Sequence, residues 1–249
     1  MALLDKVKIF IARRRLTSLN IKGDGNALEQ WIHGKVRQEF ERSREFRQAL
    51  GREQLGEITR HELREYQLHR FRRQMAYVME NSYYYQKKFK DLNLRPEDIR
   101  TYDDLEKVPL TDPADLAAEP LTFLCVSQSK VMRAFTTSGT SGTRKRLFYT
   151  QDDVLNIVDA ISAALRSVGM SGADTLQIMF PAVSAWDPGL MLDSACKVAG
   201  LRSTVCSSVD VDEQIRTMME KDTKVMIGLT SFLYRITVLA RDRYDLRSL

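Results

Sequence analysis

Arg133-Ala-Phe-Thr-Thr-Ser-Gly-Thr-Ser-Gly-Thr-Arg-Lys-Arg-Leu-Phe-Tyr-Thr150 is the stretch of sequence that decides the fold. Its centre alternates hydroxyl side chains with Gly139 and Gly142, and three cationic residues follow at once. Glycine lets backbone N–H groups approach an anion without interference from a Cβ, hydroxyls donate further hydrogen bonds, and lysine adds a compact positive charge. The composition is therefore typical of a phosphate-binding loop. Apolar β-formers on both sides, 131–135 and 147–149, predict that the loop joins two strands.

A flexible Gly/Ser/Thr linker is the alternative interpretation of this composition. The short spacing, the strand-like flanks and the basic residues gathered at one end favour a binding loop. The loop is not the P-loop of kinases and GTPases, because that pattern needs four residues between its first glycine and Gly-Lys-Ser/Thr. Here two residues separate Gly139 from Gly142.

The run from Thr137 to Lys145 resembles the phosphate loop of the adenylate-forming enzymes, which reads Ser-Gly-Thr-Thr/Ser-Gly-x-Pro-Lys, with Arg144 in place of the proline. Within that superfamily, the chain is most similar to the phenylacetate–CoA ligase branch, from about Thr59 to Leu249. Three segments carry the resemblance, in the same order as in the family: His69 to Phe89 (HRFRRQMAYVMENSYYYQKKF), Arg95-Pro-Glu-Asp-Ile and Asp104-Leu-Glu-Lys-Val-Pro-Leu-Thr111. In the first of these segments, Tyr84 stands where the family usually has phenylalanine.

This resemblance implies ATP-dependent, AMP-forming activation of a carboxylic acid to an acyl-adenylate and then to a CoA thioester. ATP, Mg²⁺ and coenzyme A would be the cofactors and co-substrates. Lys145 would be the catalytic residue, because its positive charge would stabilise the departing pyrophosphate. The cofactor-binding residues implied by the loop are Thr137, Ser138, Gly139, Thr140, Ser141, Gly142, Thr143 and Arg144.

Two further turns correspond to segments that line the acid pocket in the resembling ligases. The first lies in Phe180 to Gly189, and the second is Gly228-Leu-Thr-Ser231, which lacks the family's proline. Trp186 would form a wall for an aryl or apolar acid, although a core or rim position for this tryptophan stays open. The substrate-binding residues implied are Trp186, Asp187, Gly189, Gly228 and Thr230.

The resembling enzymes continue to a Tyr-Gly-x-Thr-Glu turn, a ribose-binding Asp and a C-terminal domain with a catalytic Lys, and none of these precedes Leu249. We therefore expect an N-terminal portion that is incomplete for catalysis alone: a fragment, a truncated product or a subunit that needs the missing C-terminal part. Two alternatives stay open, an acyl-protein or carrier-protein synthetase and a non-catalytic phosphate-binding module. An exposed sheet edge would also allow a homodimer.

Composition and charge suit a soluble globular protein of 249 residues, 43% hydrophobic and 29% charged. Residues 1–100 hold 22 Lys/Arg against 14 Asp/Glu, so the basic bias is N-terminal. Because these charges alternate with Glu, solvated helix faces are favoured over a nucleic-acid surface.

An amphipathic basic helix at 3–15 would rest on a membrane or dock on the protein. Three cysteines without metal spacing predict buried free thiols in a reducing cytoplasm, and the scattered histidines predict no metal site.

The periodicity predicts an α/β fold: a helical N-terminal region followed by a mostly parallel sheet covered by helices. A charged helix is expected over 27–49, and Thr59 with Glu62 forms a capping box for a helix to about Asn81. The strand-like runs are 131–135, 146–149, 174–180, 202–207 and 224–229; the helix-like runs are 151–168, 189–199, 211–221 and 231–241. The predicted domains are a basic extension (1–58), a helical and loop segment (59–130) and an α/β subdomain (131–249). Ligands of such sheets bind at the carboxyl ends of the strands, so the phosphate loop and the segments after 180 and 228 are expected to be neighbours.

Overall fold

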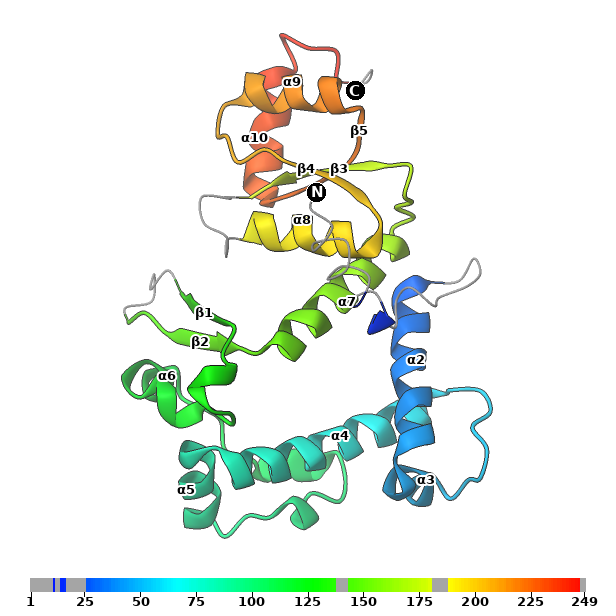
Figure 1. Ribbon diagram of the computed structural model, residues 1–249, viewed down its shortest axis with the longest axis vertical. Helices are drawn as coiled ribbons and strands as arrows, with labels where there is room; N and C mark the ends of the chain where they lie inside the picture. Colours follow the sequence, from blue (N-terminus) through cyan, green and yellow to red (C-terminus); the bar gives the residue numbers. More distant parts are fainter. Residues whose placement is uncertain (1–10, 12–13, 17–25, 138–142, 181–187, 247–249) are drawn as a thin grey trace. The chain divides into compact units, whose positions relative to one another are not determined.

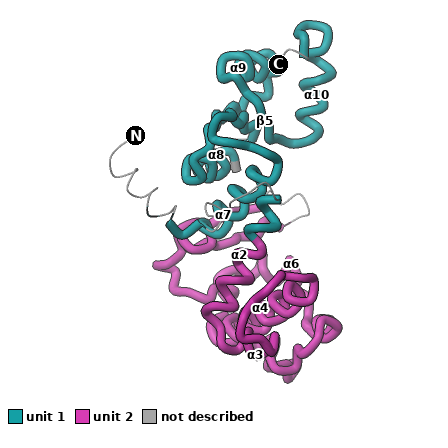
Figure 2. Tube along the Cα trace, turned by 90° about the vertical axis from the view of Figure 1, so that its right-hand side faces the viewer, with its two compact units in different colours: residues 1–31, 154–249 teal, residues 32–153 magenta. Residues whose placement is uncertain are grey.

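The computed structural model describes residues 11, 14–16, 26–137, 143–180 and 188–246. The chain forms two compact units, residues 32–153 and a second unit of residues 1–31 with 154–249 (Figure 2). We call them the helical unit and the sheet unit. The predicted domain boundaries at 58 and 130 remain a prediction.

Helices built from local capping signals dominate the helical unit. The helix expected over 27–49 is in fact two helices, α2 (Ala27–Arg42) and α3 (Arg44–Leu50). The prediction was wrong at Ser43, because this residue is extended and its hydroxyl accepts a hydrogen bond from the N–H of Phe46 at 3.1 Å. Serine competes for backbone hydrogen bonds in this way, and so it starts a new helix. Gly51, with φ of 61°, ends α3 in the left-handed conformation that glycine adopts readily.

The capping box at Thr59 and Glu62 is confirmed at the start of α4 (Arg60–Asn81). Glu62 accepts the N–H of Thr59 at 2.9 Å and pairs with Arg52 at 2.7 Å. These contacts, led by the hydrogen bond from the Thr59 hydroxyl, lower the pKa of Glu62 to about 2. After α4 come short elements, as the spaced prolines predict: α5 (Tyr83–Asp91), η2 (Pro96–Asp98), η3 (Asp103–Lys107), α6 (Pro113–Ala118), η4 (Pro120–Phe123) and η5 (Gln128–Lys130).

The two strands that flank the predicted phosphate loop are β1 (Arg133–Thr136) and β2 (Arg146–Tyr149). They pair with each other in an antiparallel two-stranded sheet, so the expectation that they continue the parallel series was wrong. The reason is the short connection, because parallel neighbours need a crossover of a dozen or more residues.

The sheet unit holds the parallel sheet that the sequence predicts. Its strand order is β4-β3-β5, with β3 (Thr175–Met179) between β4 (Arg202–Val205) and β5 (Thr223–Gly228). The helices match the predicted ranges closely: α7 (Gln151–Ser167), α8 (Pro188–Ala199), α9 (Val211–Lys221) and α10 (Thr230–Ala240).

Alternate residues of β3 build two cores, one on each face of the sheet. Leu176 and Ile178 pack with Cys196 of α8, whereas Met179 packs with Ile215 of α9 and Ile236 of α10. Figure 1 shows α8 on one side of the strands and α9 and α10 on the other. The α/β prediction is therefore confirmed as a sheet covered on both faces.

All three cysteines are free thiols, and the predicted burial is confirmed for two of them but wrong for Cys125. Cys196 and Cys206 are buried and Cys125 is half-buried. Burial raises the pKa of the Cys196 thiol to about 11, which keeps it protonated and unreactive at neutral pH. Among the helices in the described ranges, none has the length and apolar character needed to cross a membrane.

Candidate active site

An antiparallel hairpin, β1 and β2, carries the predicted phosphate loop in the helical unit. Arg133 pairs with Tyr149 and Thr136 with Arg146 at the two ends of the ladder. The rings of Phe135 and Tyr149 meet edge to face, with centroids 5.1 Å apart. Such cross-strand aromatic contacts stabilise an otherwise marginal two-stranded sheet.

Thr137 and Lys145 close the base of the loop with two reciprocal hydrogen bonds. The N–H of Thr137 donates to the carbonyl of Lys145 at 3.0 Å, and the N–H of Lys145 donates to Oγ1 of Thr137 at 3.0 Å. Lys145 is half-buried, while Thr143 and Arg144 are exposed beside it. Two cationic side chains therefore stand at the end of the loop where it rejoins β2.

Seven of the predicted site residues lie outside the described residues. They are Ser138, Gly139, Thr140, Ser141 and Gly142 of the loop, and Trp186 and Asp187 of the turn that precedes α8. Their implied contacts with phosphate and with the acid stay predictions.

The carboxyl edge of the parallel sheet brings together the two strand ends singled out in the sequence. β3 pairs with β5, and their last partners are Met179 and Gly228. The chain leaves β3 for α8 on one face of the sheet and leaves β5 for α10 on the other. Adjacent strands whose connections leave toward opposite faces form a topological switch point, where ligands bind in open α/β sheets. The strand ends at Met179 and Gly228 are thus neighbours, whereas residues 181–187 lie outside the described residues, so the predicted nearness of that segment to the one after 228 stays a prediction. The phosphate loop belongs to the other unit, so its predicted nearness to them stays a prediction.

The described residues of this edge have distinct surroundings. A Cβ on Gly228 would lie 3.1 Å from Cβ of Met179 and 3.6 Å from Cδ2 of Leu233, so glycine lets the end of β5 approach β3 closely. Thr230 is exposed in the first turn of α10, and Gly189 is buried in the first turn of α8. The N-cap residue of α10, Leu229, offers no side-chain hydrogen bond to the first N–H groups of the helix. These donors point toward the carboxyl edge and favour an anionic group there.

A buried amide network of Gln177 and Gln214 lies beneath this edge, and the sequence analysis did not predict it. Nε2 of Gln177 on β3 donates to Oε1 of Gln214 on α9 at 2.7 Å. Nε2 of Gln214 in turn donates to the carbonyls of Cys206 at 2.9 Å and Ser208 at 2.7 Å. The network therefore holds the loop after β4 at the carboxyl edge. The available signal was a glutamine inside the apolar strand Thr-Leu-Gln-Ile-Met, since a buried amide needs partners.

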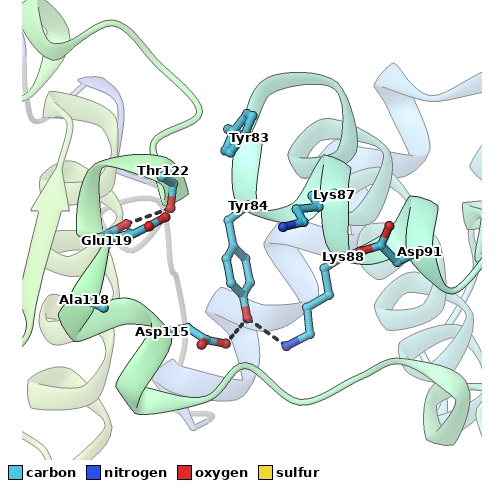
Figure 3. A pocket seen from close by; sticks show the side chains of 9 residues that line it. All are labelled: Tyr83, Tyr84, Lys87, Lys88, Asp91, Asp115, Ala118, Glu119 and Thr122. Atoms are coloured by element: carbon cyan, nitrogen blue, oxygen red, sulfur yellow. Dashed lines mark hydrogen bonds between the residues drawn. The ribbon is translucent and has the colours of Figure 1, made fainter.

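A pocket of about 560 Å³ lies between α5 and the α6–η4 segment of the helical unit (Figure 3). Tyr84 spans it, donating its hydroxyl to Asp115 at 2.6 Å and accepting from Nζ of Lys88 at 2.8 Å. Burial, followed by the hydrogen bond to Asp115, raises the pKa of Tyr84. The Tyr84 ring stacks on Phe123 at 4.0 Å and meets Tyr85 edge to face. Tyr84 and Tyr85 thus both pack against Phe123.

Across the residues that the structure describes, no three His, Cys, Asp or Glu side chains gather as they would around a metal ion.

No family model matches the chain. Phenylacetate-coenzyme A ligase of Aromatoleum evansii is 27% identical over 188 residues, 75% of this chain and 42% of that protein. The Pseudomonas putida enzyme is 23% identical over 70% of this chain and 40% of its own length, and the Escherichia coli K12 enzyme is 31% identical over 48% and 28%. The chain thus spans about two fifths of the length of the first two curated relatives.

Solved structures share the fold. A crystal structure of 2-hydroxyisobutyryl-CoA ligase in the postadenylation state with 2-HIB-AMP superposes with a TM-score of 0.64 at 17% identity, over 74% of this chain and 40% of that one. An open conformation of the same ligase with 2-HIB-AMP and CoA gives a TM-score of 0.65 at 16% identity.

Proposed function

We propose that this chain, a relative of the phenylacetate–coenzyme A ligases, supplies the phosphate loop and the acid-binding sheet edge of an AMP-forming acid–CoA ligase. In that reaction a carboxylate oxygen attacks the α-phosphorus of ATP, and the bond to the bridging oxygen of pyrophosphate breaks. A thiol then attacks the acyl carbon of the mixed anhydride, and AMP leaves. The observation that carries the proposal is the hairpin that closes a Ser/Thr/Gly loop between Thr137 and Lys145.

The residues at the base of the loop suit a polyphosphate. Catalysis of phosphoryl and adenylyl transfer rests on positioning and on neutralising charge. Lys145 supplies a compact charge, and Arg144 supplies a forked donor that can bind two phosphate oxygens at once. Both residues stand at the rim of the loop, which keeps their side chains accessible to a bound nucleotide.

Ser138 to Gly142 would hold the β- and γ-phosphates, and Lys145 would bind pyrophosphate as it departs. Mg²⁺ bound with ATP would neutralise part of the phosphate charge beside Lys145.

The acid would lie at the switch point between β3 and β5. The uncapped N-terminus of α10 favours a carboxylate, and Gly228 keeps the edge free of a side chain. Trp186, Asp187, Gly189 and Thr230 would line this side, with Trp186 selecting an aryl or apolar acid. Coenzyme A would be the thiol, as it is in the 2-hydroxyisobutyryl-CoA ligase complexes. The free thiols of the chain suit a reducing compartment such as the cytoplasm.

Isothermal titration calorimetry with pyrophosphate and with Mg²⁺–ATP tests the phosphate site. We expect Lys145→Ala to weaken pyrophosphate binding by about tenfold to a hundredfold, because a charge-assisted hydrogen bond contributes about 1.5–3 kcal/mol. Lys130→Ala is the matched control, since Lys130 is an exposed lysine of the same unit outside the hairpin. Absence of binding by the unsubstituted chain, or equal affinities for the two variants, would refute the proposal.

Proton NMR of the free acid tests the acid site. Phenylacetate resonances are expected to broaden in the presence of the chain, while acetate resonances stay sharp, because acetate offers no ring to an apolar wall. Equal behaviour of the two acids would remove the aryl or apolar preference.

A further inference from the structure

We propose that Thr137 is a positioning residue. Its hydroxyl accepts the backbone N–H of Lys145, so it keeps the two ends of the phosphate loop together without contacting phosphate itself. This inference rests on the proposed function, because it assigns a role within the same loop. It differs from the direct phosphate contact that the family resemblance implies for Thr137.

The geometry departs from a regular ladder at this pair. The last ladder partners are Thr136 and Arg146, and Thr137 faces Lys145 one step further on. In a regular antiparallel pair of this kind, both N–H groups donate to backbone carbonyls. Here only the Thr137 N–H does so, and the Lys145 N–H donates to the Thr137 hydroxyl oxygen. A side chain therefore replaces one backbone acceptor where the strands separate into the loop.

This replacement has a mechanical consequence. The two hydrogen bonds, both 3.0 Å long, fix the residue that enters the loop to the residue that leaves it. A side-chain acceptor frees the Thr137 carbonyl from Lys145, so the chain can turn away from the ladder without giving up the cross-link. A loop whose ends are already held loses less conformational freedom when it binds an anion.

The hydroxyl at position 137 is the acceptor of the Lys145 N–H. Valine has nearly the shape of threonine and favours strands, but it offers no acceptor. Serine keeps the acceptor and lacks only the methyl group. Thr136 provides the matched control, because it is the preceding residue of the same strand, is exposed, and forms no side-chain hydrogen bond with any described residue.

The test combines backbone amide exchange at Lys145 with calorimetric titration of pyrophosphate in Thr137→Val, Thr137→Ser and Thr136→Val. Thr137→Val is expected to speed exchange of the Lys145 amide about tenfold and to weaken pyrophosphate binding about fivefold, the effect of one lost hydrogen bond. Thr137→Ser is expected to remain within about twofold of the unsubstituted chain in both measurements, and so is Thr136→Val.

Unchanged exchange at Lys145 in Thr137→Val overturns the inference alone, since the hydroxyl would then not hold that amide. Faster exchange with unchanged pyrophosphate affinity also overturns it, because the contact would have no bearing on the loop. Failure of the unsubstituted chain to bind pyrophosphate refutes the proposed function together with this inference.

Discussion

Gln214→Leu is expected to destabilise the sheet unit by about 2–4 kcal/mol. The Gln214 side chain is fully buried and takes part in three hydrogen bonds, one accepted from Gln177 and two donated to the carbonyls of Cys206 and Ser208. Each bond contributes about 1 kcal/mol net, and a buried carbonyl left without a donor costs about 1–3 kcal/mol. The Gln177 amide loses only one of its two acceptors, because it still donates to the backbone carbonyl of residue 214 at 3.1 Å. Burial of the leucine offsets part of the total.

Urea unfolding followed by tryptophan fluorescence measures this effect in the right unit. Trp31, the last residue of the N-terminal part of the sheet unit, donates its indole Nε1 to Asp159 of α7 in that unit at 2.8 Å. Arg216→Leu on the same helix is the control, because Arg216 is exposed and its substitution should change stability by no more than about 0.5 kcal/mol.

A double-mutant cycle isolates the coupling between the two glutamines. Gln177→Leu with Gln214→Leu should cost at least about 1 kcal/mol less than the sum of the single changes, because neither amide is then left facing an apolar partner. A Gln214→Leu protein as stable as Arg216→Leu would refute the reasoning, and strict additivity would refute the coupling.

Two further predictions concern close packing and pH. Gly228→Ala should destabilise the sheet unit by about 1 kcal/mol, because the new methyl meets Cβ of Met179 at 3.1 Å, and overpacking outweighs the entropic gain of removing a glycine. Gly56→Ala, whose methyl would meet nothing within 4 Å, is the control, and equal urea midpoints for the two variants would contradict this account. Glu62 has a folded pKa of about 2, lowered from 4.5, so its charged form stabilises the fold above about pH 4.5 and this contribution is lost as the pH falls toward 2. Glu62→Gln should therefore flatten the loss of stability between pH 5 and pH 3 in urea titrations at each pH, and parallel curves would show that the capping box does not titrate in this way.

Local signals were sufficient for most of the elements. The Thr59 and Glu62 capping box marked the start of α4, and periodicity marked α7 to α10 to within one or two residues. These features depend on residues three or four apart in the chain, whose contacts form wherever the helix lies. The predicted phosphate loop also depends on neighbouring residues, because its glycines, hydroxyls and cations are adjacent in sequence and their order resembles a known family; its contacts with phosphate stay a prediction.

The helix break at Ser43 depends on more than local signals. Periodicity alone continues one helix through 27–49, and the break depends on whether the Ser43 hydroxyl caps Phe46 or points elsewhere. Both conformations are accessible to serine, so the choice falls to the packing of Phe46, which is fully buried.

The sequence by itself thus determined which segments are helices and strands and that a parallel sheet is present. Only the tertiary structure decided the two opposite connections that form the switch point between Met179 and Gly228, and the partners of the buried Gln177 and Gln214 amides. The physical reason is distance along the chain. Helix caps and strand periodicity arise from neighbouring residues, whereas strand partners, close Cβ approaches and buried amide networks such as Gln177 with Gln214 join residues tens of positions apart, and their energies exist only once the chain has folded.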